Sequence, residues 1–239
     1  MKNVRLKTCC GVLAAAAWIL FGITGVIRWI AGDSGLLGTE MLRAAPPEAT
    51  GLRTEDYAGV AVMTADFLTG KQEAFRYVVA QGTGSGTACA RTEVFQPHEA
   101  AHMADCRQLI RLDTGICMVS GIAALLLTAA GLFRWEGREG FQRGMLWGLR
   151  GTAAAAGVLL AWALADFDGL FVAFHHLAFP QGGWLLNPKT DLLIRLMPTA
   201  FFVRLGIRGL LRFAALPVVL AACAHAARRK TIAGTRDKE

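Results

Sequence analysis

The sequence predicts an all-α polytopic membrane protein, in which four transmembrane helices carry a mainly helical extracytoplasmic domain in the first outer loop. Composition is the first observation behind this prediction: the 239 residues are 54% hydrophobic and only 18% charged, whereas about a quarter of a soluble domain is charged. The second is a set of long apolar runs, two of which lack any charge, at 9–27 and 114–133. The third is a strong bias in where Lys and Arg fall. A soluble globule and a disordered chain are thereby excluded.

The four spans follow from run length, because about 20 apolar helical residues cross the hydrocarbon core of a bilayer. A basic tail at 1–8 precedes the first span at 9–30, which is too long for the apolar part of a signal peptide and lacks a small-residue cleavage site. The second span is 114–133. The third, 147–165, contains only Arg150, and the fourth is expected at 204–227.

Orientation follows from the basic residues. Segments 1–8, 134–150 and 228–239 together contain 12 Lys and Arg, whereas loop 31–113 has 7 basic and 11 acidic residues. The positive-inside rule therefore places both termini and the loop 134–146 in the cytoplasm, with 31–113 and 166–203 outside. The net charge of +7 is then mostly a topology signal, and no nucleic-acid partner is predicted.

The first outer loop contains a candidate site next to the membrane. Thr54, Glu55 and Asp56 precede an expected N-capped helix at 57–68, and a short strand is expected at 71–80. Pro97 then opens a helix that continues into the second span. A spacing of three places Glu99, His102 and Asp105 on roughly one face of this helix.

The second outer loop, 166–203, is rich in aromatic residues, with Phe at helical spacing around Asp168 followed by His175 and His176. Aromatic side chains suit a membrane interface without any further function. The preference of aromatic side chains for the interface does not explain the two histidines. Two outer segments that each offer His with Asp predict a shared site.

A zinc site is an alternative, because His98-Glu99-x-x-His102 spells H-E-x-x-H, which places two imidazoles on one helical face with a Glu beside them. The extended zinc signature would need Gly at position 105 and His at position 108, but this chain has Asp105 and Gln108 there. A third ligand would have to be His175, His176 or Asp191. A zinc-dependent membrane protease or esterase therefore stays open.

A resemblance to a bacterial family favours a different reaction. The chain resembles the Lit family, the lipoprotein intramolecular transacylases, in its four spans, its large first outer loop and its two histidine segments. The residues that carry the resemblance are Glu99-x-x-His102-x-x-Asp105, Phe174-His175-x-x-x-Phe179, Trp184, Asn187-Pro188-x-x-Asp191-x-x-Ile194 and Pro198-x-x-Phe201-Phe202. Cys106 stands where the family often has an aliphatic residue.

The resemblance implies a membrane acyltransferase that moves the sn-2 acyl chain of a diacylglyceryl lipoprotein to the α-amine of its N-terminal cysteine. It implies catalytic roles for His102 and His175, no metal, no cofactor, and diacylglyceryl lipoproteins and membrane lipids as partners. No oligomeric state is predicted. The site would lie at the outer face of the cytoplasmic membrane. A non-enzymatic lipid-binding or accessory protein with structural histidines is a second alternative.

The chemistry needs a base for an amine and a donor for an ester oxygen, and two imidazoles can supply both. Asp105 and Asp168 could fix the imidazole tautomers. Arg208 or Arg212, deep in the fourth span, could neutralise Asp168 or Asp191, or contact substrate oxygens. The expected supporting residues are Glu99, Asp105, Asp168 and Asp191, and the expected substrate-binding residues are Trp184, Arg208 and Arg212.

Overall fold

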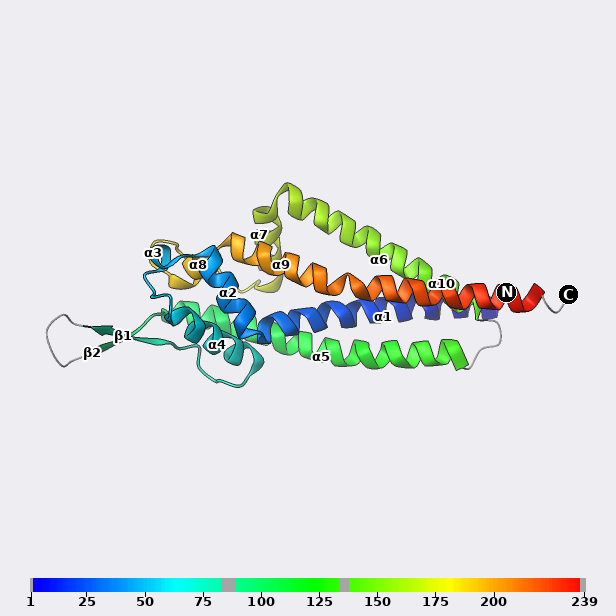
Figure 1. Cartoon of the computed structure of the whole chain (residues 1–239), viewed down its shortest axis with the longest axis horizontal. Helices are drawn as coiled ribbons and strands as arrows, with labels where there is room; N and C mark the ends of the chain where they lie inside the picture. The colour runs from blue at the N-terminus through cyan, green and yellow to red at the C-terminus, as the bar shows by residue number, and fades with distance from the viewer. Residues whose placement is uncertain (1, 83–88, 134–137, 237–239) are drawn as a thin grey trace. The chain divides into compact units, whose positions relative to one another are not determined.

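The computed structural model describes residues 2–82, 89–133 and 138–236. In chain order (Figure 1), its elements are α1 (Lys2–Gly32), α2 (Ser34–Ala44), α3 (Pro47–Thr50), α4 (Asp56–Thr69), β1 (Val78–Gly82), β2 (Cys89–Glu93), α5 (Pro97–Phe133), α6 (Glu139–Ala165), α7 (Phe167–Ala178), α8 (Leu192–Leu196), α9 (Thr199–Phe213) and α10 (Ala215–Arg236).

Four helical stretches of the described chain are long and apolar enough to span a membrane, as the sequence predicts: Val4–Gly32, Pro97–Phe133, Glu139–Ala165 and Thr199–Ala226. Large apolar side chains are exposed along them, including Val119 on α5 and Leu164 on α6, which is the pattern of a lipid-facing surface. The last stretch breaks between α9 and α10 at Ala214. Pro217, near the start of α10, has no N–H to bond the carbonyl of Phe213, which accounts for the break.

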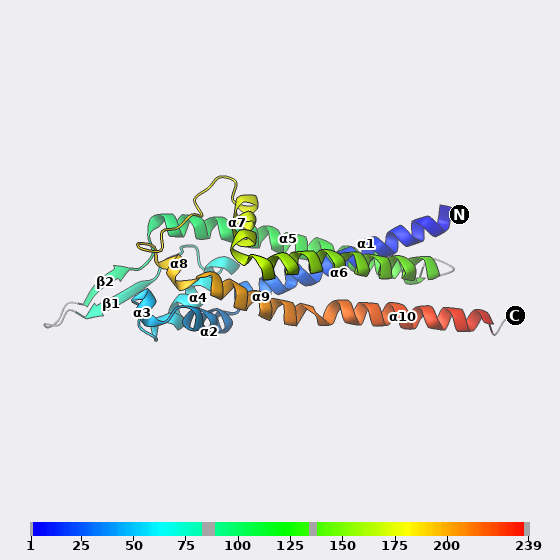
Figure 2. The same ribbon diagram turned by 90° about the horizontal axis from the view of Figure 1, so that it is seen from above.

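The chain divides into two compact units. Unit 1 lies within 1–26, 113–165 and 210–239. In it, α1 and α6 approach closely because Gly11, Gly144 and Gly148 have no side chain: a Cβ at Gly144 would collide with the carbonyl oxygen of Thr8. Helix α10 contacts α6, and Figure 2 shows both helices from above.

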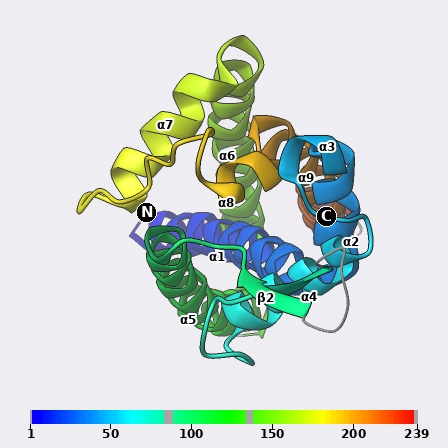
Figure 3. The ribbon, with the colours of Figure 1, turned by 90° about the vertical axis from the view of Figure 1, so that its left-hand side faces the viewer.

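Unit 2 comprises 27–112 and 166–209, so the two segments that the sequence places in separate outer loops form one packed body. Helix α2 packs on α4, and α3 packs on α8 (Figure 3). The core contains aromatic and aliphatic side chains from both segments, among them Tyr57, Phe67, Phe95, Leu196 and Phe201.

Two local expectations need correction. The strand is not in the first part of 71–80: β1 starts at Val78 and pairs antiparallel with β2. Helix α4 begins at Asp56 without a side-chain cap from Glu55. The carboxylate of Asp56 instead accepts hydrogen bonds from Arg53, so the acidic residues before this helix serve a local ion pair.

Candidate active site

His102 of α5 and His175 of α7 lie together in unit 2. Their ring centroids are 6.0 Å apart, with an angle of 31° between the planes. Both residues are buried, with exposed fractions of 8% and 7%. His176, the next residue on α7, is exposed, because successive helical residues point about 100° apart.

Aromatic rings surround the pair. Trp184 lies with its ring centroid 5.0 Å from that of His175. Phe179 contacts both imidazoles, at 5.0 Å from His102 and 5.5 Å from His175. Phe171, one turn before His175, is 4.1 Å from it. The histidines therefore lie in apolar surroundings that shield them from water.

The ring nitrogens of His175 have distinct roles. Its Nδ1 lies 2.8 Å from the carbonyl oxygen of Phe171, and a carbonyl can only accept, so we assign the proton to Nδ1. In the neutral ring Nε2 is then a free acceptor. Burial lowers the pKa of His175 below its ordinary value, and this outweighs the bond to Phe171, which raises the pKa. The ring is therefore kept neutral near pH 7.

His102 contacts the thiol of Cys106, with 3.7 Å between Nε2 and Sγ. Its Nδ1 is buried and has no hydrogen-bond partner among the residues that the structure describes. Nitrogen accepts better than sulfur, so a thiol that donates to Nε2 leaves the proton of a neutral ring on Nδ1. In that tautomer His102 offers a donor without a partner.

Glu99 is completely buried and holds two backbone segments together. One carboxylate oxygen accepts the N–H of Gln96 at 2.6 Å, just before α5. The other accepts the N–H of Leu193 at 2.5 Å, in the first turn of α8. Since His102 follows Glu99 by one turn, this carboxylate fixes the start of α5 against α8.

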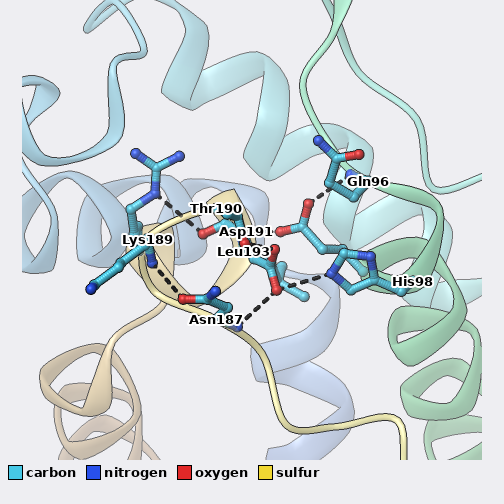
Figure 4. Close-up of polar contacts among 9 residues, drawn as sticks. Gln96, His98, Asn187, Lys189, Thr190, Asp191 and Leu193 are labelled. Carbon is cyan, nitrogen blue, oxygen red and sulfur yellow. Dashed lines mark hydrogen bonds and ion pairs between the residues drawn. The ribbon is translucent and has the colours of Figure 1, made fainter.

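Asp191 makes a second connection between the same elements (Figure 4). Its carboxylate lies 2.9 Å from Nε2 of His98 and accepts from the backbone N–H of Asn187 and the hydroxyl of Thr190. These bonds, that of Thr190 first and that of His98 next, lower the pKa of Asp191 to about 2. The segment before α8 is thereby fixed to the N-terminus of α5.

The other two predicted acidic residues, Asp105 and Asp168, form hydrogen bonds with side chains other than the two imidazoles. Asp105 accepts from the side-chain amide of Gln181 at 3.0 Å, and Asp168 accepts from the hydroxyl of Thr199 at 2.9 Å. The tautomer role expected for Asp168 falls to the carbonyl of Phe171, because a helical His can reach the carbonyl four residues earlier.

The predicted substrate-binding arginines are on α9. Arg208 pairs with Glu40 of α2, at 3.2 Å, and not with Asp168 or Asp191. Glu40 was not among the residues predicted from the sequence. Helical spacing places it on the same face as Leu37 and Met41, which are buried. Arg212 lies one turn beyond Arg208, in unit 1.

The zinc alternative finds no support in this geometry. Within the described ranges, no three His, Cys, Asp or Glu side chains are arranged to hold a metal ion. Glu99 has both oxygens bound to backbone N–H groups, so it is not free to activate a water. His98 is paired with Asp191.

Comparison with known proteins agrees with this architecture. A family model described as lipoprotein intramolecular transacylase Lit matches residues 12–202. The in meso structure of the membrane integral lipoprotein intramolecular transacylase Lit from Bacillus cereus is similar in fold, with a TM-score of 0.68, 13% identity, and coverage of 97% of this chain and 98% of that one. A variant of that protein with a histidine replaced by arginine gives a TM-score of 0.64 at 16% identity, over 100% of this chain and 96% of that one. No curated protein matches the chain significantly.

Proposed function

Since this chain belongs to the Lit family of lipoprotein intramolecular transacylases, and is thus a membrane acyltransferase, we propose that it moves the sn-2 acyl chain of a diacylglyceryl lipoprotein to the α-amine of the lipoprotein's N-terminal cysteine. The observation that carries this proposal is the pair of buried imidazoles, His102 and His175, with 6.0 Å between their ring centroids. The basic-residue asymmetry supports a site at the outer membrane face, with both termini in the cytoplasm.

The reaction needs proton transfer and orientation, and no cofactor. The amine nitrogen forms a bond to the sn-2 carbonyl carbon, the bond from that carbon to the glycerol oxygen breaks, and the proton lost by the amine ends on the glycerol oxygen. Since nucleophile and acyl donor belong to one molecule, the protein mainly has to hold them in a reactive geometry.

His175 is the base in this proposal. Its Nδ1–H is bound to the carbonyl of Phe171, so Nε2 is the nitrogen that takes the proton of the amine. His102 is the donor: its Nδ1–H would stabilise the oxyanion by a hydrogen bond, and Nε2–H of the protonated His175 would return the proton to the leaving glycerol oxygen. Trp184 and Phe179 would exclude water, which would otherwise compete with the amine for the ester.

In this proposal, the four predicted acidic residues hold the segments around the histidines in position. Glu99 and Asp191 tie α5 to α8 and so support His102. Asp105 and Asp168 bind Gln181 and Thr199, which lie on either side of the segment that carries Trp184. None of the four needs to touch the substrate.

A test of the proposed reaction uses the different stability of esters and amides. Intramolecular transfer leaves the lipoprotein mass unchanged, but an N-acyl amide survives mild alkali that removes ester-linked chains. We expect one alkali-resistant acyl chain on the N-terminal cysteine only in cells that contain the protein. Complete loss of acyl chains from these lipoproteins in alkali, at normal protein levels, would refute the proposal.

The proton equilibrium of His175 gives a prediction on pH. Because burial lowers its pKa, we expect the ring to gain a proton only below the ordinary value of 6.5. Between this value and the lower pKa of His175 in the folded protein, the unfolded chain binds more protons than the folded one. The free energy of unfolding therefore decreases as the pH falls through this range. Histidine NMR of the protein in nanodiscs, with His175→Ala to assign the signal, measures this midpoint. A midpoint of 6.5 or above would contradict the lowering of the pKa by burial, and a midpoint above pH 7 would leave His175 mostly protonated at pH 7 and remove it as the base.

Metal independence is a further prediction. We expect full transacylation after exhaustive chelation, and activity near that of the unaltered protein in His98→Gln, whose amide can still donate to Asp191. Elemental analysis of the purified protein is the parallel measurement. Stoichiometric zinc that is lost in His98→Gln would favour the hydrolase alternative.

A further inference from the structure

Glu40 is a buried carboxylate shared by two arginines. It is only 2% exposed, and its Oε1 accepts from Nη1 of Arg43 at 3.3 Å and from Nη2 of Arg208 at 3.2 Å. A buried carboxylate is costly unless it is paired and hydrogen-bonded. Glu40 therefore fixes the positions of two guanidinium groups, one from α2 and one from α9.

These guanidinium groups are incompletely used by Glu40. The side chains of Arg43 and Arg208 are 53% and 49% exposed, and each guanidinium has five N–H donors. Two positive charges and one negative charge leave the cluster at +1. Arg204, exposed and one turn before Arg208 on α9, raises the local charge to +2. The surface thus has both the charge and the donors for an additional anion.

The location of the arginines narrows the choice of anion. Arg204 and Arg208 lie within the candidate membrane span Thr199–Ala226, and Ile207, between them, is 53% exposed. Exposed apolar and basic side chains on one membrane helix are typical of the boundary between hydrocarbon and headgroups. Phosphate is the anion held at that depth, and a guanidinium can bind it with two parallel hydrogen bonds.

We propose that Arg43 and Arg208, held by Glu40, together with Arg204 one turn earlier on α9, bind the phosphate of an anionic phospholipid headgroup. A second source of the same chemistry is free phosphate. The apolar surface at Ile207 favours the lipid, whose chains would cover it. This changes the ligand expected for Arg208 from substrate ester oxygens to a phosphodiester. The proposal does not depend on the histidine chemistry.

Native mass spectrometry of the full-length protein in detergent tests the proposal, with dioleoylphosphatidylglycerol as the probe and dioleoylphosphatidylcholine for comparison. The unaltered protein should retain phosphatidylglycerol preferentially. Arg204→Gln, which leaves the Glu40 pairs intact, and Arg208→Gln should each weaken binding by about tenfold, which corresponds to about 1.4 kcal/mol, because each removes a charged donor to the phosphate. Arg150→Gln, an exposed arginine on α6, is the matched control and should bind normally.

Glu40→Gln should change the affinity for phosphatidylglycerol in the opposite direction. It raises the cluster charge from +2 to +3, so the folded variant should bind phosphatidylglycerol more tightly. Equal binding of the lipid by unaltered protein and Arg204→Gln would overturn the proposal, as would equal retention of both lipids. Displacement of the lipid by inorganic phosphate at equal concentration would identify a free-anion site and overturn the lipid assignment. Circular dichroism establishes that each variant compared is folded.

Discussion

Alanine at His102 or at His175 is expected to lower the formation of lyso-form lipoprotein by roughly 100-fold to 10,000-fold, the usual contribution of general acid–base catalysis. His175→Ala removes the proposed base, and His102→Ala removes the proposed donor to the oxyanion, whose loss falls within the same range. The rings are buried, but the hydrogen bonds that they make in the described chain stay within their own helices, to Cys106 for His102 and to the carbonyl of Phe171 for His175. Membrane levels should therefore stay near normal, and alkali-resistant N-acylation at matched protein levels is the measurement.

His176→Ala is the matched control for His175→Ala. Both residues are on α7, but His176 is exposed and reaches only the edge of Trp184, with ring centroids 5.1 Å apart. It should retain nearly all activity. Full activity in His102→Ala or His175→Ala would defeat the assignment of the reaction centre.

Glu99→Ala is expected to cause the largest loss of stability. It removes both acceptors for the N–H groups of Gln96 and Leu193, and hydrogen bonds to a charged group contribute about 1.5–3 kcal/mol each. The loss should be a few kcal/mol, with a lower midpoint of thermal unfolding in detergent. Glu99→Gln keeps one acceptor and should lose less.

The transacylation rate should fall with stability in this series, because Glu99 fixes the helix turn that precedes His102. Glu73→Ala, which removes an exposed acid, controls for the loss of charge. If Glu99→Ala unfolds at the same temperature as Glu73→Ala, the connection between α5 and α8 is not held by this carboxylate. A normal rate in a Glu99→Ala protein that is folded but less stable would show that this connection does not position His102.

The membrane helices were predictable because their cause is local. Uncharged runs of about 20 residues satisfy their own backbone hydrogen bonds and can only be buried in lipid. The continuity of α5 across the candidate site also followed from local features, namely Pro97 at the first position and no breaker after it. In the same way, the histidines stood out because apolar packing at an interface gives no reason for His102 and His175.

The features of the fold and of the candidate site that could not be predicted from the sequence depend on tertiary contacts. Glu99 matches a metalloprotease motif in sequence, and its hydrogen bond with the N–H of Leu193, 94 residues later, is a long-range contact that the motif does not predict. The pairing of Glu40 with Arg208 is a contact between residues 168 positions apart. The packing of 27–112 with 166–209 as one unit likewise depends on long-range burial, which periodicity along a single helix does not report.

The most direct measurement of the central claim follows one acyl chain. The purified protein, in a lipid bilayer, is given a synthetic diacylglyceryl lipopeptide with a heavy-isotope chain at sn-2 only, and fragment masses locate the label. We predict that the heavy chain moves to the α-amine of the N-terminal cysteine, and that His175→Ala leaves it on glycerol. A heavy chain released as free fatty acid, or retained at sn-2 by the unaltered protein, would contradict the account.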